Sequence, residues 1–279
     1  MTGRLFVVAT PIGNLEDLGH RAARVLGEVA VVACEDTRTS RVLLDRYGVR
    51  TPTTSLHAHS QAHEVDALVS RLAAGDDVAL ISDAGTPLIS DPGGALVAAA
   101  LTAGIEVVPV PGPSAVLAAL AGAGLPADRF VFLGFLPRAE ADQRELLGPL
   151  RALPLALVVY ESPHRTPETL AVLARVLGDR AACVARELTK KFETFERGSL
   201  GELATRLGEG LRGEIVIVVA PPVLGAAEAE APADLDADIA RLAARGLSAS
   251  DAARVLAGAH GLSKKEAYRR VLAHKGEGP

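Results

Sequence analysis

The first half of the chain alternates short apolar runs with longer segments whose apolar residues follow a helical spacing. The runs are rich in Val, Ile and Leu and lie at residues 5–10, 29–34, 78–83 and 105–110. The helical patterns between them span residues 20–27, 37–47 and 62–74. Continuous apolar runs are typical of strands buried on both faces of a parallel sheet. The pattern therefore predicts an α/β lobe.

A second series of apolar runs begins near Phe130. Its members lie at residues 130–135, 155–160, 182–187, 192–198 and 214–220. The spacing tightens between residues 182 and 198, which predicts neighbouring antiparallel strands in a mixed sheet. We therefore expect an α/β protein of two lobes, an N-terminal lobe over residues 1–117 and a C-terminal lobe over residues 118–222.

The composition changes after Pro221 and Pro222. The Ala-rich acidic stretch over residues 223–233 is predicted to be a linker that runs into a helix. Residues 234–279 contain more Lys and Arg than Asp and Glu, and they are predicted to form a small all-α segment like a helix-turn-helix.

Two helix starts are predicted inside this C-terminal segment. Ser248 is followed three residues later by Asp251, and Ser263 by Glu266. A serine with an acid at this spacing satisfies the free amide groups of a first helical turn. Glycines between the two sites indicate a tight turn that joins two short helices.

Composition narrows the function classes. Hydrophobic residues make up 49% of the chain and aromatic ones 3%, which argues against disorder and against an aromatic platform for nucleic acid. The net charge of −5 means that any contact with nucleic acid depends on a local basic face. Cys34 and Cys183 are too few for a disulfide framework and are expected to be small buried hydrophobes in a reducing compartment.

No export or membrane insertion is expected. The N-terminal apolar run is too short for a signal peptide. The uncharged stretch over residues 107–127 contains four prolines, which would break a spanning helix. We therefore expect a cytoplasmic protein.

Three loops that directly follow predicted strands are candidates for ligand binding, because open α/β sheets bind ligands at the carboxyl ends of their strands. The loop over residues 82–94, SDAGTPLISDPGG, combines glycines that allow close backbone approach with prolines that fix its shape. The loops over residues 108–120 and 10–18 have similar features. Each also has a plainer interpretation as an ordered turn between elements.

The three loops contain no lysine, and the chain has neither a G-x-G-x-x-G fingerprint after the first strand nor a P-loop. A polyphosphate ligand is therefore disfavoured, and a neutral or cationic ligand is favoured. S-adenosylmethionine, a sulfonium cation, fits this expectation.

Three charged clusters are candidates for catalysis or substrate binding. Asp36 follows a strand, and its position is equally consistent with a helix cap and with a role in substrate binding. Arg38 and Arg41 are candidates for contacts with RNA phosphates. Glu161 and His164 end another predicted strand and are the preferred acid/base or ribose-binding pair.

Arg186, Glu187 and Lys190 are the alternative catalytic set, in which Lys190 would stabilise an alkoxide. The plainer interpretation of this third cluster is a solvated ion-pair face.

A cluster of His57, His59, His63 and Glu64 is interpreted as ordinary surface histidines at a helix start, because its spacing matches none of the standard zinc patterns. No metal is expected.

Seven ordered motifs together resemble the ribosomal RNA small subunit methyltransferase I family, within the class III or tetrapyrrole methylase superfamily. The motifs are VATPIGNLEDL, ACEDTRTS, SDAGTPLISDPG, PVPGPSA, DRFVFLGFLPR, YESPHR and ARELTKKFE, which cover residues 4–220 almost continuously. The sequence GTPLISD at residues 85–91 departs from the G-D-P-x-x-Y-G pattern of the wider superfamily, which favours the rRNA branch.

The resemblance implies a homodimer of two-lobed subunits that hold S-adenosylmethionine between the lobes. It also implies 2′-O-methylation of cytidine 1402 in the 16S rRNA of the 30S subunit. For cofactor binding it points to Pro11, Asp83, Gly85, Thr86, Leu88, Ile89, Pro111, Gly112, Ser114 and Ala115. The basic C-terminal segment is similar to the family's helix-turn-helix, with Lys264, Lys265, Arg269 and Arg270 as RNA-binding candidates.

Two alternatives stay open on the sequence: a class III methylase that acts on a tetrapyrrole, and a non-catalytic RNA-binding assembly factor. The general base is not singled out among Glu161, His164, Glu187 and Lys190. The substrate is either naked rRNA or an assembled particle.

Overall fold

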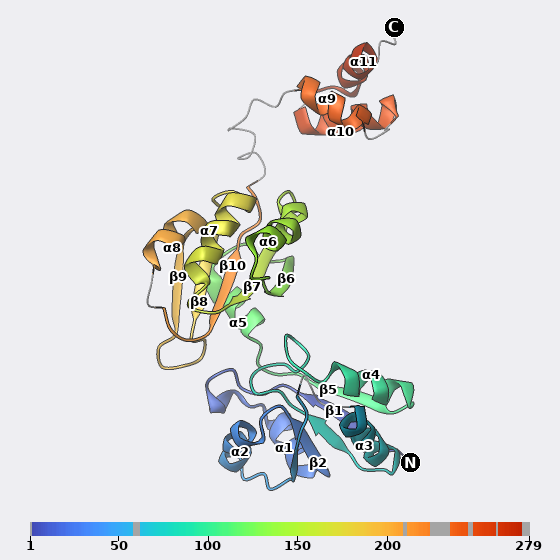
Figure 1. Ribbon diagram of the computed structural model, residues 1–279, viewed down its shortest axis with the longest axis vertical. Helices are drawn as coiled ribbons and strands as arrows, with labels where there is room; N and C mark the ends of the chain where they lie inside the picture. The colour runs from blue at the N-terminus through green and yellow to red at the C-terminus, as the bar shows by residue number, and fades with distance from the viewer. Residues whose placement is uncertain are drawn as a thin grey trace. The chain divides into compact units, whose positions relative to one another are not determined.

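The structure, a computed structural model, describes residues 2–57, 62–208, 211–223, 235–244, 248–260 and 262–274. Contacts divide the chain into two compact units, Met1–Pro221 and Pro222–Pro279. The first unit contains two five-stranded sheets, one in each half of its sequence (Figure 1). This arrangement agrees with the two predicted α/β lobes.

The first sheet is entirely parallel in the order β3-β2-β4-β1-β5. Its strands are β1 (Arg4–Val8), β2 (Val31–Cys34), β3 (Thr53–Ser55), β4 (Val78–Leu80) and β5 (Glu106–Val110). Four of them coincide with the predicted apolar runs. The sequence analysis missed β3, because this three-residue edge strand is polar and only partly buried.

Helices cover both faces of the first sheet (Figure 1). They are α1 (His20–Glu28), α2 (Thr37–Arg46), α3 (Ala62–Ala73) and α4 (Gly94–Thr102), with the short 3-10 helix η1 (Leu15–Asp17) before α1. Phe6 and Val8 of β1 pack with α1 and α2, whereas Leu5 packs with α3 and α4. This alternation follows from the two-residue side-chain period of a strand.

The second sheet is mixed, in the order β6-β7-β10-β8-β9. Its strands are β6 (Phe130–Phe135), β7 (Ala156–Glu161), β8 (Ala181–Arg186), β9 (Thr194–Ser199) and β10 (Ile215–Val219). Only β6 and β7 pair in parallel, and β8 and β9 are antiparallel neighbours. The predicted antiparallel pair between residues 182 and 198 is therefore confirmed.

Different helices pack on the two faces of the second sheet. One face carries α6 (Glu140–Leu147), α7 (Thr166–Leu177) and α8 (Leu200–Arg206), with the 3-10 helix η2 (Gly148–Leu150) after α6. The other face carries α5 (Ala115–Ala123), whose Gly122 lies so close to the Phe195 ring that an added Cβ would come within 2.3 Å of it. The predicted lobe boundary at residues 117–118 falls inside this helix and stays a prediction.

The Pro222–Pro279 unit contains α9 (Leu235–Ala244), α10 (Ala249–His260) and α11 (Lys264–His274). Its buried core includes Ile239, Leu256 and Val271, one from each helix. Ser248 Oγ accepts a hydrogen bond from the Asp251 amide at 3.1 Å, and Ser263 Oγ accepts one from the Glu266 amide at 3.2 Å, which confirms both predicted helix starts. Apart from Val223, the predicted linker 223–233 lies outside the described residues.

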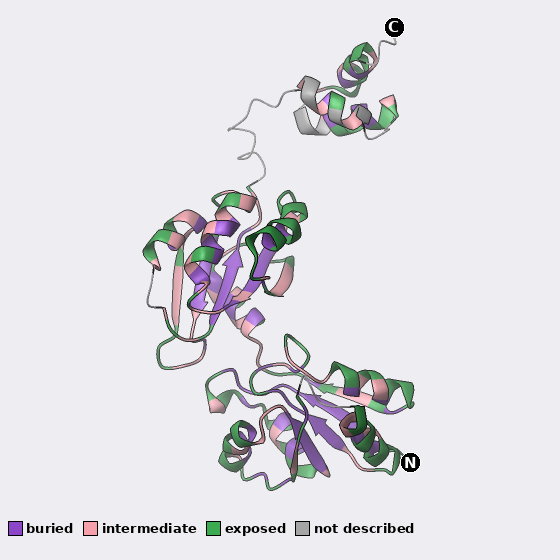
Figure 2. Ribbon diagram, viewed as in Figure 1, coloured by how far each residue is buried: buried purple, intermediate pink, exposed green. Residues whose placement is uncertain are grey.

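Burial follows the sheets, as Figure 2 shows for the strands of both lobes. Cys34 and Cys183 are fully buried and free, as predicted, and burial raises the pKa of both thiols. Within the described ranges, no helix is both long enough and apolar enough to cross a membrane.

We expect the Leu157→Ala substitution to lower the free energy of unfolding by about 2–5 kcal/mol, because Leu157 is fully buried in the second sheet and its truncation leaves a cavity. The exposed Val42→Ala change on α2 should alter that free energy by about 0.5 kcal/mol or less. Chemical denaturation of the full chain measures both. Equal midpoints for the two variants would contradict this packing.

Candidate functional site

The three candidate loops meet at the carboxyl ends of β1, β4 and β5. The Thr10 amide donates to the Gly85 carbonyl at 2.8 Å, and the Gly85 amide donates back to the Thr10 carbonyl at 3.1 Å. Thr86 Oγ1 donates to the Pro113 carbonyl at 3.1 Å. The loop over residues 82–94 is therefore bonded to both of its neighbours.

The 82–94 loop has an unusual backbone. Leu88 and Ser90 have φ values of 75° and 65°, and Gly85 has a φ of 81°. Positive φ is uncommon for residues other than glycine and is kept only where surrounding contacts impose it. At Gly85 a Cβ would also lie 3.2 Å from a methyl group of Ile12. The loop is a fixed shape held by its contacts.

The loop after β1 docks on the second lobe. Ile12 is buried in the hydrophobic cluster that contains α5 and Leu188. The Asn14 amide donates to Thr189 Oγ1 at 3.0 Å, and a Cβ on Gly13 would come within 2.9 Å of the Leu188 carbonyl oxygen. This contact fixes the β8–β9 connection of the second lobe against the ligand loops of the first.

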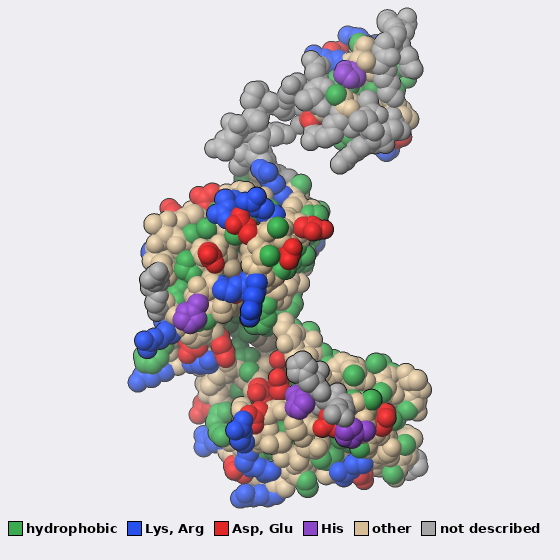
Figure 3. All heavy atoms as spheres, in the orientation of Figure 1, with side chains coloured by type: hydrophobic (Ala, Val, Ile, Leu, Met, Phe, Trp, Pro, Cys, Tyr) green, Lys and Arg blue, Asp and Glu red, His purple; other side chains and the backbone are tan. Residues whose placement is uncertain are grey.

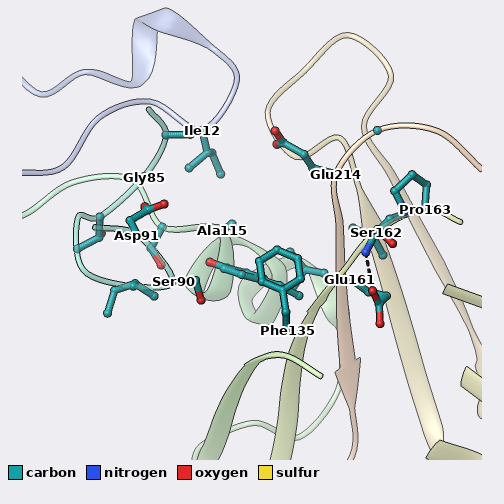
Figure 4. Close-up of a pocket in the computed structure, with 18 residues that line it drawn as sticks. Ile12, Gly85, Ser90, Asp91, Ala115, Phe135, Glu161, Ser162, Pro163 and Glu214 are labelled. Atoms are coloured by element: carbon teal, nitrogen blue, oxygen red, sulfur yellow. Dashed lines mark hydrogen bonds between the residues drawn. The ribbon is translucent and has the colours of Figure 1, made fainter. Parts of the chain in front are cut away.

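A cleft of about 320 Å³ lies where these segments meet (Figure 4). The first-lobe and α5 residues that line it are Ile12, Ala84, Gly85, Thr86, Ile89, Ser90, Asp91, Ser114 and Ala115. The second sheet contributes Phe135, Tyr160, Glu161, Ser162, Pro163, Gly213, Glu214, Ile215 and Val216. Five of the ten predicted cofactor residues are among them: Gly85, Thr86, Ile89, Ser114 and Ala115.

The other five predicted cofactor residues do not line the cleft. Asp83 accepts a hydrogen bond from the Asp36 amide at 3.1 Å, so its carboxylate joins two loops of the first lobe. Gly112 packs against Ala9, where a Cβ would lie 3.0 Å from the Ala9 Cβ. Pro11, Leu88 and Pro111 belong to the same loops without lining the cleft.

The charged side chains that line the cleft among the described residues are all acidic. The described residues that line it include three carboxylates, those of Asp91, Glu161 and Glu214, and no Lys, Arg or His. Burial raises the pKa of Asp91, and the nearby Glu35 and Asp83 carboxylates raise it further. A polyphosphate would be repelled here, whereas a cation would be attracted.

Aromatic rings form one wall of the cleft (Figure 4). The Tyr160 ring meets the Phe135 ring edge-on with 5.6 Å between centroids, and Phe132 lies on its other side at 4.8 Å. Phe135 is 58% exposed, and burial raises the pKa of Tyr160. Phe135 and Tyr160 were not among the site residues predicted from sequence, although they lie at the ends of two neighbouring parallel strands.

Glu161, a preferred acid/base candidate, has a carboxylate that is fully buried and engaged. Oε1 accepts the Ser162 amide at 2.7 Å, and Oε2 accepts the Thr169 hydroxyl at 2.7 Å and lies 3.5 Å from Arg165 Nη2. In Figure 4 the carboxylate points away from the open cleft. This geometry favours a positioning role for Glu161 over proton transfer. His164, its predicted partner, is exposed and does not line the cleft.

The alternative set forms an ion-pair network beside the cleft. Lys190 Nζ lies 2.9 Å from Glu187 Oε1 and 3.1 Å from Glu214 Oε2, and Glu214 lines the cleft. The Glu187 carboxylate also accepts the Glu214 amide at 3.0 Å. The hydrogen bonds from Lys190 and from the Glu214 amide lower the pKa of Glu187. Burial alone would lower the pKa of Lys190, but its contacts with Glu187 and Glu214 outweigh burial and raise that pKa. Lys190 is thus held as a cation.

Gly213 leaves room for this network. Its φ is 89°, and a Cβ there would lie 2.4 Å from Glu187 Oε1. Arg186, the third member of the predicted set, donates through Nε to Thr194 Oγ1 at 3.2 Å and lies at the edge of the network. The sequence analysis did not select Gly213.

A family model described as "Tetrapyrrole (Corrin/Porphyrin) Methylases" matches residues 4–204, and "RsmI C-terminal HTH domain" matches residues 229–275. "Ribosomal RNA small subunit methyltransferase I" of Mesorhizobium japonicum is 48% identical, over 98% of this chain and 94% of its own length. The chain belongs to the ribosomal RNA small subunit methyltransferase I family. The predicted family is confirmed.

Other members of this family are similar over their full length. The protein of the same name from Pseudomonas aeruginosa is 47% identical, with 99% of both chains covered. The one from Escherichia coli O157:H7 is 42% identical, with 98% of this chain and 96% of its own length covered.

Solved structures share the fold of the first unit. A uroporphyrin-III-C-methyltransferase from Thermus thermophilus has a TM-score of 0.56 at 23% identity, over 78% of this chain and 94% of its own. A diphthine synthase has a TM-score of 0.62 at 17% identity, over 78% and 90%. The class III methylase fold predicted from the motifs is therefore confirmed.

The predicted RNA-binding residues of this family member lie on exposed helix surfaces. Lys264, Lys265, Arg269 and Arg270 are all exposed on α11. Arg38 has a side chain that is 90% exposed, and Arg41 lies on the same helix, α2. The described residues include no cluster of three or more metal-ligating side chains, and His59 of the predicted histidine cluster lies outside them.

Asp36 is the N-cap of α2, as one of its two interpretations predicts. Its Oδ1 accepts the Arg38 amide at 2.8 Å, and Arg38 Nη2 lies 2.8 Å from Oδ2. These hydrogen bonds to Arg38 lower the pKa of Asp36 to about 2. The cap occupies the carboxylate, so a substrate role for Asp36 has no support in this geometry.

We expect the Asp36 carboxyl to titrate with a midpoint of about 2 in the folded protein. Because this pKa lies below that of the unfolded chain, the cap stabilises the fold above about pH 4 and is lost as the pH falls through about 2. The Arg38→Ala substitution should raise the midpoint only partly, since backbone amides still donate. Carboxyl-carbon NMR measures it, and a wild-type midpoint near 4 would contradict the assignment.

Proposed function

We propose that this protein transfers the methyl group of S-adenosylmethionine to the 2′-hydroxyl of cytidine 1402 in 16S rRNA of the small ribosomal subunit. The observation that carries the proposal is the cleft, which has carboxylates but no cation among its described lining and has Lys190 fixed beside it. The names of the full-length relatives support an rRNA of the small subunit as the substrate.

The cleft fits this methyl donor in size and charge. A volume of about 320 Å³ is within the range of small-molecule sites. The positively charged donor meets the Asp91 carboxylate, and the described residues that line the cleft include no Lys, Arg or His. The loops that carry Gly85 and Ser114 are fixed by their own hydrogen bonds, so they give the cleft a defined shape. S-adenosylmethionine supplies a methyl carbon that is already activated by the sulfonium, so alignment accounts for much of the rate.

The residues of this chain then have distinct roles. Lys190, kept cationic by Glu187 and Glu214, stabilises the negative charge that develops on the ribose oxygen. Glu161 positions the turn after β7 through Ser162 and Thr169. His164 and Glu187 remain the candidates for the group that accepts the hydroxyl proton, and the lowered pKa of Glu187 makes its carboxylate a weak base.

RNA binding is proposed for two basic surfaces. One is the exposed face of α11 with its four cations, and the other is the start of α2 with Arg38 and Arg41. The match to a C-terminal helix-turn-helix model supports the first. We propose the 30S particle in the cytoplasm as the place of action, which agrees with two free buried cysteines.

A homodimer is part of the proposal. α4 and α5 are apolar helices whose Leu101 and Leu117 are 59% and 58% exposed, and Phe130 of the edge strand β6 is 39% exposed. Apolar residues around a whole helix are typical of helices that are buried on all sides. A second copy of the chain would cover them.

The two alternative functions, a tetrapyrrole methylase and a non-catalytic assembly factor, have less support in the structure. A tetrapyrrole substrate is favoured by the fold of the solved relatives alone. A non-catalytic assembly factor would keep RNA binding without using the cleft. The basic α11 and the fixed Lys190 both favour a reaction on RNA over these two alternatives.

We expect Gly85→Arg to abolish methylation while RNA affinity is retained, because the new side chain fills the cleft and adds a cation to it. A chain that ends at residue 233 should instead lose RNA affinity first. The measurement maps ribose methylation of 30S subunits from cells that lack this protein, and RNA binding is measured in parallel. Equal methylation by wild type and Gly85→Arg would refute the cleft assignment, and labelling of a porphyrinoid with unlabelled 30S would refute the rRNA substrate.

We expect Lys190→Met to lower the single-turnover methylation rate by about 10²–10³-fold, as removal of one charge-stabilising donor does in other enzymes. Affinity for the methyl donor should not fall, since Lys190 does not line the cleft and its removal leaves the Glu214 carboxylate, which does, without its cation. Lys190→Arg, which keeps the cation, should recover part of the rate. An unchanged rate in Lys190→Met would show that the network is only structural.

A further inference from the structure

The end of the β8–β9 connection, Lys191 and Phe192, has no part in the site described above. Phe192 is 64% exposed. The next phenylalanine along the chain, Phe195, is packed against α5 instead. A single exposed apolar side chain is common on protein surfaces, so Phe192 points to a partner only together with the turn and the charges that surround it. The low aromatic content of the chain argues against a platform of several rings, but a single exposed ring can still stack on one base.

The connection that carries Phe192 is rigid. Glu187 and Thr189 have φ values of 52° and 65°, and the Lys190 amide donates to the Glu187 carbonyl at 3.0 Å. Glu193 Oε2 accepts the Thr189 amide at 2.6 Å, and the Glu193 amide donates to the Lys190 carbonyl at 3.1 Å. The two residues between Lys190 and Glu193 are therefore presented outward on a short, cross-bonded turn.

The carboxylates around the turn are engaged in contacts within it, whereas its cation Lys191 is exposed. The carboxylates of Glu187 and Glu193 are hydrogen-bonded within the turn, and Glu187 also binds Lys190. Lys191 is exposed, with its Nζ 5.5 Å from the centroid of the Phe192 ring. In Figure 3, Lys and Arg side chains gather around this end of the second lobe. The outer surface of the turn is thus basic and aromatic.

The turn lies next to the cleft. Lys190, the neighbour of Lys191, is 3.1 Å from Glu214, which lines the cleft. If the target ribose lies beside Lys190, as the proposed function requires, the neighbouring nucleotides of the strand come within reach of Lys191 and Phe192. Stacking of a base on an aromatic ring together with a lysine on a phosphate is the usual way in which proteins hold single-stranded RNA.

We propose that Lys191 and Phe192 bind the RNA strand beside the target nucleotide, Phe192 by stacking on a neighbouring base and Lys191 by contacting a phosphate. The inference deepens the proposed function and rests on it. RNA is favoured over a protein partner because the apolar surface here is one ring flanked by a cation, whereas protein-binding sites expose larger apolar patches.

The test uses the full-length protein with unmethylated 30S subunits and with a naked 16S rRNA fragment that contains the target region. Phe192→Ala should weaken affinity for both by about ten-fold or more, and Phe192→Trp, which still stacks, should retain it. Lys191→Ala should weaken binding to all sequences and reduce the slope of log affinity against log salt by about 1. Calorimetric binding of S-adenosylmethionine should be unchanged in all three variants.

Matched controls come from the turn before β7, at the opposite end of that strand from Glu161. Leu153→Ala removes an apolar side chain that is 38% exposed, and Arg151→Ala removes an exposed cation. Both should bind RNA like the wild type.

Wild-type affinity of Phe192→Ala for the naked fragment would overturn the proposal. If only 30S binding falls in that variant, the ring contacts a ribosomal protein, and the RNA assignment is wrong. RNA affinity is measured separately from methyl transfer. Failure of the wild type to methylate 16S rRNA would therefore refute the proposed function, while the RNA affinities of the wild type and Phe192→Ala would still test the role of Phe192.

Discussion

The docking of the β1 loop on the second lobe is the contact on which the site depends. Ile12 lies in the second lobe's core cluster, and the Asn14 amide bonds Thr189, so both sides of the cleft are held by one short segment. The same segment is paired with Gly85 through the Thr10 bridge. A shift of this segment would therefore move the ligand loop and the Lys190 turn together, which couples the proposed methyl-donor site to the proposed catalytic cation.

Electrostatics divides the site into two regions. Inside the cleft, carboxylates and backbone groups suit a cationic ligand, and burial of Asp91 strengthens these interactions by excluding water. At the rim, Lys190 is balanced by Glu187 and Glu214, while Lys191 faces outward. In the proposed function, this separation disfavours phosphates in the donor site and leaves cations at the rim for the RNA backbone.

Much of this architecture was predictable from sequence, because it depends on local rules. Apolar runs located nine of the ten strands found among the described residues, and the loops after β1, β4 and β5 meet as parallel topology requires. Serine and acid spacing located the starts of α10 and α11. The polar edge strand β3 has no such signal.

The far wall of the cleft was not predictable in the same way. β10 runs antiparallel to β7, so its first residues, with Gly213 and Glu214 before them, lie beside the end of β7. The prediction considered only loops that follow the carboxyl ends of strands, so it did not include Gly213 and Glu214, which precede a strand. The engagement of Glu161 was missed for a similar reason, because Thr169 comes from the following helix and its hydroxyl meets the carboxylate only in the folded protein.

Calorimetric titration of the folded full-length protein with S-adenosylmethionine, and separately with its neutral demethylated product, tests the central claim most directly. The account predicts saturable binding of both at one site per chain, with the charged donor bound at least as tightly, because the cleft presents carboxylates and no described cation. Absence of binding by both compounds, while the protein is shown to be folded, would contradict it.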